Sequence, residues 1–367
     1  MTLTIYICLR YLKGLLWSLL GVLFLILLID GSDQINFMSS NEKTFLTGVK
    51  STALRIPSLL VDTLPLVVML GSLITFISLS RSSELVVVRS AGRSVIRILW
   101  APIIITILIG IFFTTIGNPI VATSIKGSED FLRSLNLKPR NFMSVTGENI
   151  WLRDTEANKQ TVIKASRTNF EGKILYDITL FEFDGEDNLK RKITASKGIL
   201  KEGKWYLDKV ILWTIKNNEP ISKAFNFQKL EKISLSTNLS TEQILDNFAD
   251  PKAINFWILP KFIEKLEVSG FSAVRHKVFY QSQLARPLFF VAMLLIGATF
   301  SLHQSRFGQT GILVVLSVSC GFLLFSIKRI AESLGAANEI PIYLAAFGPS
   351  VSGIFLIVGL LLHFEDG

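Results

Sequence analysis

Residues 98–125 read ILWAPIIITILIGIFFTTIGNPIVATSI, a run of 28 residues without a single Lys, Arg, Asp or Glu. A bilayer core of about 30 Å is crossed by roughly 20 apolar helical residues, so this run is long enough to span a membrane. Five other charge-free runs, of 16 to 25 residues, lie at 14–29, 63–80, 287–305, 307–327 and 340–364. The sequence therefore predicts six transmembrane helices.

The charged residues are concentrated in the middle of the chain. Of the 67 Lys, Arg, Asp and Glu residues, 45 lie between Lys126 and Lys277, and the other 215 residues carry only 22. Such a distribution excludes a disordered chain and a disulfide scaffold, and it predicts a membrane α-helical protein with three helices on each side of one water-exposed insert. We expect residues 1–125 to hold the first three helices, 126–250 the insert, and 251–367 a connecting helix with the last three.

The positions of the basic residues predict the orientation. Arg10 and Lys13 precede the first span, and Arg306 lies between the fourth and fifth. Four more follow the second span: Arg81, Arg89, Arg93 and Arg97. Because Lys and Arg in short loops stay in the cytoplasm, both termini should be cytoplasmic and the insert outside. The net charge of +9 then reflects membrane anchoring and anionic lipid, and no nucleic acid partner is expected.

The insert has the pattern of a β domain. Runs rich in β-branched and aromatic residues alternate with Gly, Asn and Asp turns, at 150–153, 161–165, 174–183, 189–195, 205–215 and 221–227. Even spacing of this kind predicts an antiparallel sandwich or jellyroll, whose apolar face is either a packed core or a groove for lipid or a partner. Asp250-Pro251 then predicts the start of a surface helix whose apolar face includes Leu259, Phe262, Ile263 and Leu266.

Motifs for catalysis and metal binding are missing from the sequence. The chain has no Gly-x-x-x-x-Gly-Lys-Ser/Thr phosphate loop, and His276, His303 and His363 do not have the spacing of metal ligands. We therefore expect no catalytic residue, no metal site and no cofactor in this chain. Asp62, near the predicted start of the second span, is interpreted as an interfacial carboxylate.

The loop after the second span contains a candidate docking helix. Ser83 can cap a short helix over about 82–92, and Glu84 suits its positive end. Leu85 and Val88 lie on one helical face beside Glu84 and Arg89. This helix could dock into a cytoplasmic partner, and an ordinary interfacial loop held by its arginines is an equal alternative.

Seven cations lie near the outer membrane boundary: Lys126, Arg133, Arg275, Lys277, Arg286, Lys328 and Arg329. Cations there oppose the cytoplasmic bias of basic residues, so each needs an anionic partner. A phosphorylated lipid headgroup would supply one, with Lys328 and Arg329 as the leading pair. The alternatives are contact with ordinary phospholipid and, for Arg329, an ion pair with Glu332.

Several short motifs together resemble the LptF/LptG (YjgP/YjgQ) permease family of lipopolysaccharide export. They are Leu64-Pro65-Leu66, the segment 81–92, Asn118-Pro119 at the end of the third span, Asp250-Pro251, the segment 266–270 with Arg275, Arg286-Pro287-Leu288 and Gly321-Phe322. No single motif is specific, but their order and spacing cover nearly the whole chain and are closest to the LptG branch. One departure is Asp33-Gln34, which is preceded by Asp30, Gly31 and Ser32 where LptG proteins can carry a Lys.

The resemblance implies a function and a set of partners. The chain would be a multi-pass permease of the bacterial inner membrane that pairs with an LptF-like permease and an LptC-like jellyroll protein, its own jellyroll being periplasmic. ATP and Mg²⁺ would bind to a separate LptB-like ATPase dimer, contacted through Glu84, Leu85, Val88 and Arg89. Lipopolysaccharide would be bound by the outer cations: Lys328, Arg329, Lys126, Arg286, Arg133 and Arg275. A non-transporting membrane adaptor, whose β domain binds a periplasmic protein, and an intramembrane enzyme are the alternatives.

Overall fold

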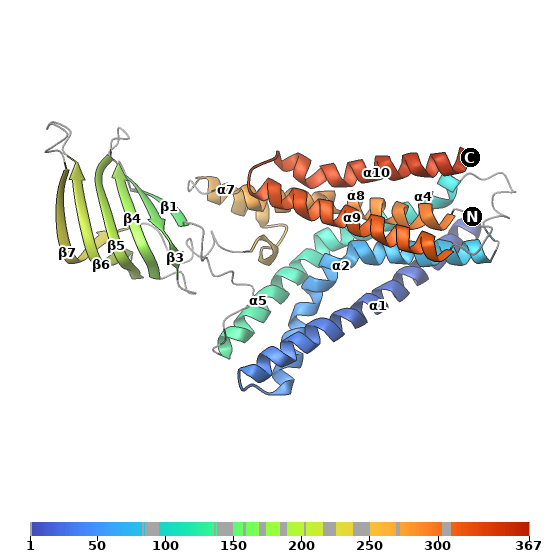
Figure 1. Cartoon of the computed structure of the whole chain (residues 1–367), viewed down its shortest axis with the longest axis horizontal. Helices are drawn as coiled ribbons and strands as arrows, with labels where there is room; N and C mark the ends of the chain where they lie inside the picture. Colours follow the sequence, from blue (N-terminus) through green and yellow to red (C-terminus); the bar gives the residue numbers. More distant parts are fainter. Residues whose placement is uncertain are drawn as a thin grey trace. The chain divides into compact units, whose positions relative to one another are not determined.

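The computed structural model describes residues 2–82, 84, 95–135, 137, 150–156, 159–168, 174–183, 189–201, 203–215, 225–237, 250–268, 272–302 and 310–366. The chain divides into two compact units (Figure 1). The helical unit comprises Met1–Asn136, Pro251–Pro260 and Val274–Gly367, and the β unit comprises Leu137–Asp250 and Lys261–Ala273. The two are described separately below.

The helical unit contains the predicted spans. Its helices are α1 (Thr2–Ser40), α2 (Phe45–Arg81), α4 (Val95–Phe112), α5 (Asn118–Ser134), α8 (Val274–Leu302), α9 (Thr310–Ala336) and α10 (Ile342–Asp366), with the π-helical turn η1 (Phe113–Gly117) joining α4 to α5. Within the described residues, six helical stretches are long and apolar enough to cross a membrane. The predicted number of spans, three on each side of the insert, is confirmed.

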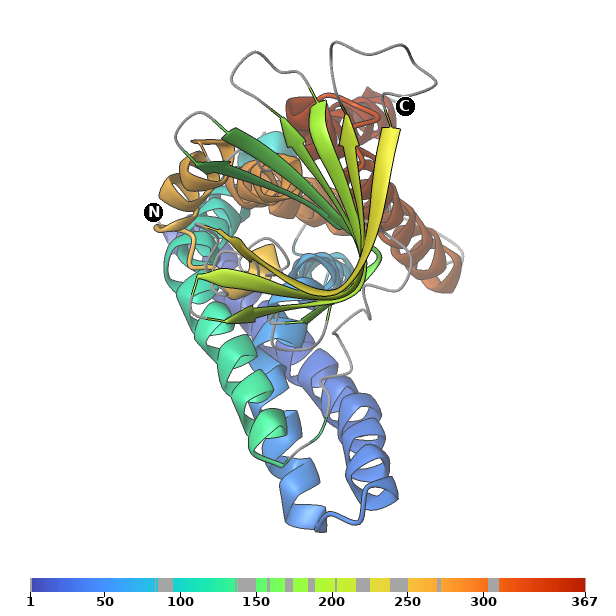
Figure 2. The same ribbon diagram turned by 90° about the vertical axis from the view of Figure 1, so that its left-hand side faces the viewer.

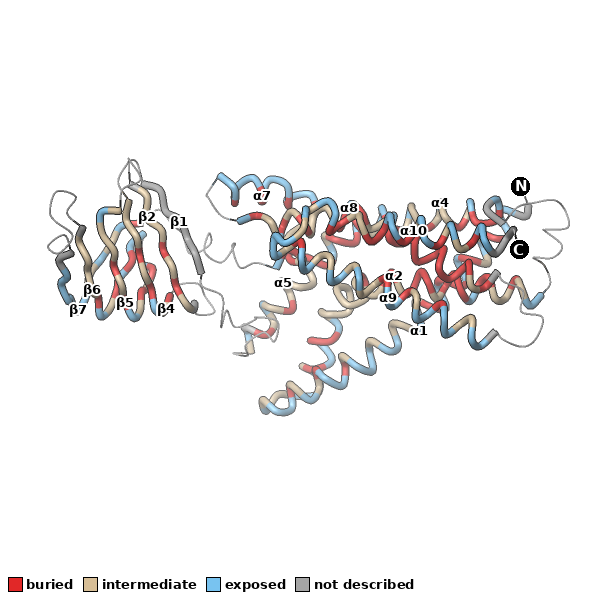
Figure 3. The backbone as a smooth tube through the Cα atoms, turned by 45° about the horizontal axis from the view of Figure 1, so that its top comes forward, coloured by how far each residue is buried: buried red, intermediate tan, exposed pale blue. Residues whose placement is uncertain are grey.

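Helix α8 forms the centre of the helical unit and packs against α2, α4, α9 and α10 (Figure 3). From Phe289 to Ile296 every side chain is buried. Gly297 allows α2 to approach closely, because a Cβ at this position would lie 2.5 Å from the Met69 carbonyl oxygen. The Ser72 hydroxyl of α2 donates to the Leu294 carbonyl across the same crossing at 2.8 Å. Small residues that bring helix backbones together in this way are the usual means of packing within a membrane.

Replacing Gly297 with leucine should therefore destabilise the helical unit. An inserted side chain has no room against the α2 backbone, and overpacking of this kind costs about 1–3 kcal/mol. We expect a lower melting temperature for the detergent-purified chain. Gly359→Leu on α10 is the matched control, since nothing lies within 4 Å of a Cβ at that position. Equal melting temperatures for the two variants would contradict this description of the α2–α8 contact.

The helices extend beyond the charge-free runs that located them. Asp30, expected just after the first span, lies inside α1 and forms an ion pair of 3.1 Å with Arg55 of α2. One turn further on, the Ser51 hydroxyl donates to the Gln34 side-chain oxygen at 3.1 Å. These contacts between α1 and α2 give the Asp30 carboxylate and the Gln34 side chain polar partners, so the helix can continue through them. For the same reason Asp62 lies in the middle of α2 rather than near its start.

The third helix also continues where the sequence predicted its end. Pro119, with no N–H, cannot donate to the Thr115 carbonyl as a regular helix would require. The helix passes this point through the π-helical turn η1, and the Trp257 indole N–H donates to the Thr115 oxygen at 3.1 Å. The Asn118 side-chain oxygen accepts the Phe256 backbone N–H at 2.7 Å. The helix therefore continues past Asn118-Pro119, because tertiary partners replace the missing hydrogen bond.

The β unit contains an antiparallel sheet, inserted between the third and fourth spans as predicted. The strands are β1 (Ile150–Glu156), β2 (Lys159–Ala165), β3 (Arg167–Thr168), β4 (Ile174–Phe183), β5 (Leu189–Lys201), β6 (Lys204–Ile215) and β7 (Phe225–Ser236). They form one sheet in the order β1-β2-β4-β5-β6-β7, with β3 beside β4. Figure 2 shows that this sheet is strongly curved. The predicted fold class, a six-span membrane protein with an inserted antiparallel β domain, is confirmed.

A row of residues that the strand register skips bends the sheet. Asp177, Ser196, Lys209 and Glu231 lie on neighbouring strands and are all skipped in the strand register. Asp177 and Lys209 have positive φ values of 51° and 55°. Each skipped residue reverses the alternation of its strand, so the buried positions on β5 change from 193 and 195 to 198 and 200. One apolar face therefore stays on the inside of the bend, and it forms the core of this unit.

Two element boundaries differ from the prediction. The sixth strand was expected over 221–227, whereas β7 runs over Phe225–Ser236, with residues 221–224 outside the described part. Lys229, Glu231 and Lys232 are exposed on this strand, which explains why its apolar signal was weak. After Asp250 the chain forms the single 3₁₀ turn η2 (Pro251–Ala253), and the helix α7 begins only at Leu259 and ends at Val268.

Candidate functional site

A small cavity lies within the helical unit beside the cations that the sequence singled out. Its volume is about 70 Å³, and its walls come from α2, α8, α9 and η2. Four basic residues and two carboxylates line it: Lys252, Arg286, Lys328, Arg329, Asp62 and Glu332. We call this feature the cation cavity. Pockets for drug-sized ligands measure about 300–1,000 Å³, so the cation cavity can hold one compact polar group rather than a whole lipid.

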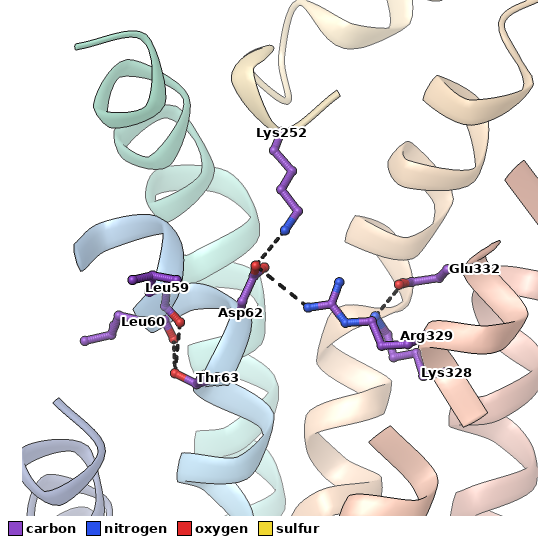
Figure 4. A network of polar contacts seen from close by, with 8 residues as sticks. All are labelled: Leu59, Leu60, Asp62, Thr63, Lys252, Lys328, Arg329 and Glu332. Atoms are coloured by element: carbon purple, nitrogen blue, oxygen red, sulfur yellow. Dashed lines mark hydrogen bonds and ion pairs between the residues drawn. The ribbon is translucent and has the colours of Figure 1, made fainter. Parts of the chain in front are cut away.

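Lys328 is held within its own helix and against an aromatic ring. Its ammonium contacts the Glu332 carboxylate, four residues later on α9, at 2.5 Å (Figure 4). The same ammonium lies 5.2 Å from the centre of the Phe289 ring on α8. Glu332 is within reach of both Arg329, three residues earlier, and Lys328, four residues earlier, but its contact in the structure is with Lys328. The alternative pairing of Arg329 with Glu332 is therefore wrong.

Arg329 instead points toward α2. A guanidinium nitrogen of Arg329 lies 3.8 Å from the Asp62 carboxylate, and the Lys252 ammonium donates to the same oxygen at 2.6 Å (Figure 4). Asp62 thus connects α2 to α9 and to η2, which are far apart in the sequence. A carboxylate in an apolar span is expensive unless it is paired, and these two cations supply the pairing.

Arg286 connects the cavity to the irregular turn in the third span. It lies on α8, and its guanidinium donates to the Phe113 carbonyl at 3.2 Å. Phe113 is the first residue of η1, where the regular helical hydrogen bonding changes. Close by, the Thr114 hydroxyl donates to the Gln283 carbonyl at 3.0 Å. Arg286 therefore contributes positive charge to the cavity and also stabilises the π-helical turn.

The other predicted cations are not brought to the cation cavity. Lys126 is exposed on α5 and Arg275 is exposed at the start of α8, and neither lines the cavity. Arg133 lies in α5, but its side chain is outside the described part of the chain. Among the described residues, no group of three or more His, Cys, Asp or Glu side chains is placed to hold a metal ion.

The predicted docking helix can be followed only at Glu84. Residues 83 and 85–94, with Leu85, Val88 and Arg89 among them, lie outside the described residues. The Glu84 carboxylate forms an ion pair of 3.4 Å with Arg10 of α1. Arg10 also donates to the Tyr6 hydroxyl at 2.9 Å and to the Ser78 hydroxyl of α2 at 3.4 Å. One arginine therefore joins α1, the end of α2 and Glu84.

Sequence reasoning missed three members of the cation cavity. Asp62 was interpreted as a headgroup-level carboxylate, while Lys252 and Glu332 were given no role in the site. The available signal was Asp62 itself, which is the one charged residue between Arg55 and Arg81. A charge in such a stretch needs a partner, but nothing in a single sequence identifies one 190 residues away.

Comparison with known proteins gives a consistent result over the whole chain. Residues 5–363 match the family described as Lipopolysaccharide export system permease LptF/LptG. The chain is 24% identical to the lipopolysaccharide export system permease protein LptG of Haemophilus influenzae over 369 residues, covering 100% of this chain and 99% of that protein. It is 22% identical to LptG of Escherichia coli K12 over 361 residues, covering 96% and 97% of the two. With six apolar helices around an inserted sheet, the chain belongs to the LptF/LptG family of lipopolysaccharide export permeases.

Proposed function

We propose that this chain is the LptG-type permease subunit of an ABC transporter that extracts lipopolysaccharide from the inner membrane and passes it to a periplasmic bridge. The observation that carries this proposal beyond family membership is the cation cavity. It gathers four basic side chains among α2, α8, α9 and η2, in a unit whose long helices carry few charged residues in their apolar stretches. Phosphate groups on a lipid are the natural ligands of such a cluster.

Apolar surface on two helices supports pairing with another permease and lateral entry of lipid. On α1, Trp17 is 69% exposed and Phe24 60%, and on α9 Phe322 is 61% exposed. Surfaces of this kind must be covered by lipid tails or by a partner helix. In the proposed complex an LptF-like subunit and lipopolysaccharide contact them, and the acyl chains pass beside α9, which carries Lys328 and Arg329.

Extraction requires an external source of energy. Exposing acyl chains to water costs about 0.8 kcal/mol for each CH₂ group, so a lipid with several chains does not leave the bilayer spontaneously. We assign ATP and Mg²⁺ to a separate LptB-like ATPase dimer that contacts Glu84 and the segment after it. The lifted lipid then passes to the β domain and an LptC-like protein.

The proposed orientation can be tested with a thiol reagent. In our proposal both termini are cytoplasmic and the β domain is periplasmic, as the arginines around residues 81–97 indicate. Lys229 is exposed on β7, so Lys229→Cys should react with a membrane-impermeant maleimide in intact spheroplasts, after Cys8 and Cys320 are replaced by serine. Labelling that occurs only after lysis would reverse the orientation.

Purification of the tagged chain tests the proposed assembly. If the chain is a transporter subunit, an ATPase and a second six-span permease should co-purify with it in stoichiometric amounts. Lipopolysaccharide should co-purify with this complex. Recovery of a periplasmic protein alone would favour the membrane adaptor and would contradict the transporter assignment.

A further inference from the structure

Asp62 is an unusual residue for its position. It lies in the middle of α2 and is the one charged residue between Arg55 and Arg81. Its carboxylate is partly exposed toward the cation cavity, with 32% of the side chain accessible. Both of its contacts, with the Lys252 ammonium and the Arg329 guanidinium, are made through the same oxygen, Oδ2. In this structure the Asp62 carboxylate therefore already neutralises part of the positive charge of the cavity.

The two ion pairs that α9 makes in the cavity differ in length. Glu332 pairs with Lys328 at 2.5 Å within one helix, and both side chains are at most 20% exposed. The Asp62–Arg329 pair joins two helices at 3.8 Å, which is too long for a hydrogen bond, and Arg329 is 44% exposed. A guanidinium has five N–H donors, so Arg329 can accept an additional oxyanion. Asp62 is thus the anion that an incoming ligand can displace from Arg329.

Two buried polar groups on α8 face the cavity without a hydrogen-bond partner among the described residues. The Ser282 hydroxyl and the Gln283 side-chain oxygen line the cation cavity, and these residues are only 6% and 4% exposed. Buried polar groups normally have a partner, so a ligand is expected to supply it. The hydroxyl can donate to a phosphate oxygen directly, and the amide can do so once its NH₂ group is turned toward the cavity.

Charge and size indicate which group fits. Four basic side chains and two carboxylates give the cation cavity a net formal charge of 4 − 2 = +2, which becomes 4 − 1 = +3 when Asp62 turns away. A phosphate monoester carries about −1.5 to −2 at neutral pH. The volume of about 70 Å³ has room for one such group and not for a sugar with its chains. A single phosphate monoester therefore fits the cavity in size and balances most of its positive charge.

From these observations we infer that Asp62 is an internal substitute for the phosphate of the transported lipid. In the empty cavity the Asp62 carboxylate neutralises Arg329 and Lys252. When a phosphate monoester enters, Arg329 and Lys252 turn to it, Ser282 and Gln283 gain a partner, and Asp62 is released. This inference rests on the proposed function, because it describes how the positive charge of the same lipid-binding site is neutralised when no lipid is bound.

The exchange has a consequence for the chain that leads to the β domain. Lys252 belongs to η2, directly after Asp250, which is the last residue of that part of the β unit. Beyond it, the Phe256 N–H and the Trp257 indole fix the segment to Asn118 and Thr115. Release of Lys252 therefore removes one contact of the turn between Asp250 and Phe256 while the anchor behind it stays in place. Binding of a phosphate in the cavity in this way changes the contacts of the segment that joins the two units.

Lipid-binding measurements test the exchange directly. The full-length chain, with the subunits that co-purify with it, is placed in neutral-lipid nanodiscs and titrated with bisphosphorylated lipid A or with the same lipid after removal of its phosphates. Asp62→Asn removes the competing anion, so it should bind phosphorylated lipid A about tenfold more tightly than wild type, a difference of about 1.4 kcal/mol. Its affinity for phosphate-free lipid A should be unchanged. Asp62→Glu, which keeps the charge, should behave as wild type.

A matched control separates this effect from the loss of any carboxylate between helices. The carboxylate of Asp30 on α1 also pairs with an arginine of α2, but Asp30 lies outside the cavity. Asp30→Asn should therefore leave lipid affinity unchanged. Melting temperatures show whether each variant is folded. Hydrogen exchange of the peptide over residues 250–256 should accelerate when phosphorylated lipid A is added to wild type, and unchanged exchange would overturn the release of Lys252.

The possible failures are distinguishable. If Arg329→Gln weakens binding of phosphorylated lipid A while Asp62→Asn binds as wild type, the site is correct and the exchange is wrong. If Arg329→Gln leaves the affinity for phosphorylated lipid A unchanged, the cavity does not bind lipid phosphate. The proposed site and the exchange are then both wrong. If Asp62→Asn gains as much affinity for phosphatidylglycerol, a phosphodiester, the assignment to a phosphate monoester is overturned.

Discussion

Lipopolysaccharide export is expected to fall at least about a hundredfold when Lys328 and Arg329 are both replaced by alanine. In the proposed site Arg329 donates a charged hydrogen bond to the lipid phosphate, worth about 1.5–3 kcal/mol, and the loss of Lys328 removes a second positive charge from the same cavity, so the combined loss amounts to about 3 kcal/mol or more. The variant also leaves Glu332 and Asp62 without these cations inside the helical unit. Transport can be measured with the reconstituted complex in proteoliposomes, together with the melting temperature of the variant.

The exposed cations provide the comparison for this result. Lys126 and Arg275 belong to the set predicted from the sequence but do not line the cation cavity. In our proposal they contact the lipid at the membrane surface, where pairs are screened, and their double alanine variant should lose no more than about fivefold, or 1 kcal/mol. Wild-type transport by Lys328→Ala/Arg329→Ala would reduce that pair to an ordinary anchor at the headgroups.

Replacement of Glu84 by alanine is expected to uncouple ATP hydrolysis from export. The proposed contact pairs the Glu84 carboxylate with a basic group of the ATPase, and a desolvated contact between charged groups costs about 2–5 kcal/mol when truncated. Transport should therefore fall by more than about tenfold while the chain still inserts and still pairs with the second permease. Co-purification of the ATPase and the ratio of ATP hydrolysed to lipid exported provide the readouts.

Arg10 allows the two roles of Glu84 to be separated. In the structure its guanidinium pairs with Glu84 and also contacts Tyr6 and Ser78. If Glu84 served only to fix α1 to the end of α2, then Arg10→Ala should reproduce the whole defect of Glu84→Ala. We expect Arg10→Ala to retain most of the coupling, because it leaves the carboxylate available to the ATPase.

The spans could be predicted from the sequence because the cost of a charge in the membrane is local. Charge-free runs located all six helices, but a helix continues past its run where a charge has a partner elsewhere in the chain. Asp30 is neutralised by Arg55, and Asp62 by Lys252. At Pro119 the helix continues because Trp257 supplies the donor for Thr115. These pairings depend on the packing of distant segments, which periodicity does not contain.

In the β domain, too, local features could be predicted from the sequence and long-range features could not. Alternation and turn residues identified five of the strands that the structure contains, because those signals lie within a few residues of each other. The bend does not have such a signal. It requires Asp177, Ser196, Lys209 and Glu231 to be skipped together on four strands, and only the assembled sheet aligns them.

The candidate site was predicted in part. Lys328, Arg329 and Arg286 were found because cations at that end of a span oppose the usual distribution of charge. Their arrangement was not found, since it depends on which helix faces of α2, α8 and α9 meet. Asp62 and Lys252 complete the cavity from 190 residues apart.

Site-specific photocrosslinking from the wall of the cation cavity tests the central claim most directly. A photoreactive phenylalanine analogue at Phe325, which lines the cavity, should crosslink to lipopolysaccharide in cells, and the crosslink should disappear in Lys328→Ala/Arg329→Ala. The same analogue at Phe355 of α10, 73% exposed and away from the cavity, serves as the control. A crosslink at Phe325 that is no stronger than at Phe355, or that persists without the two cations, would contradict the binding of lipid phosphate at this site.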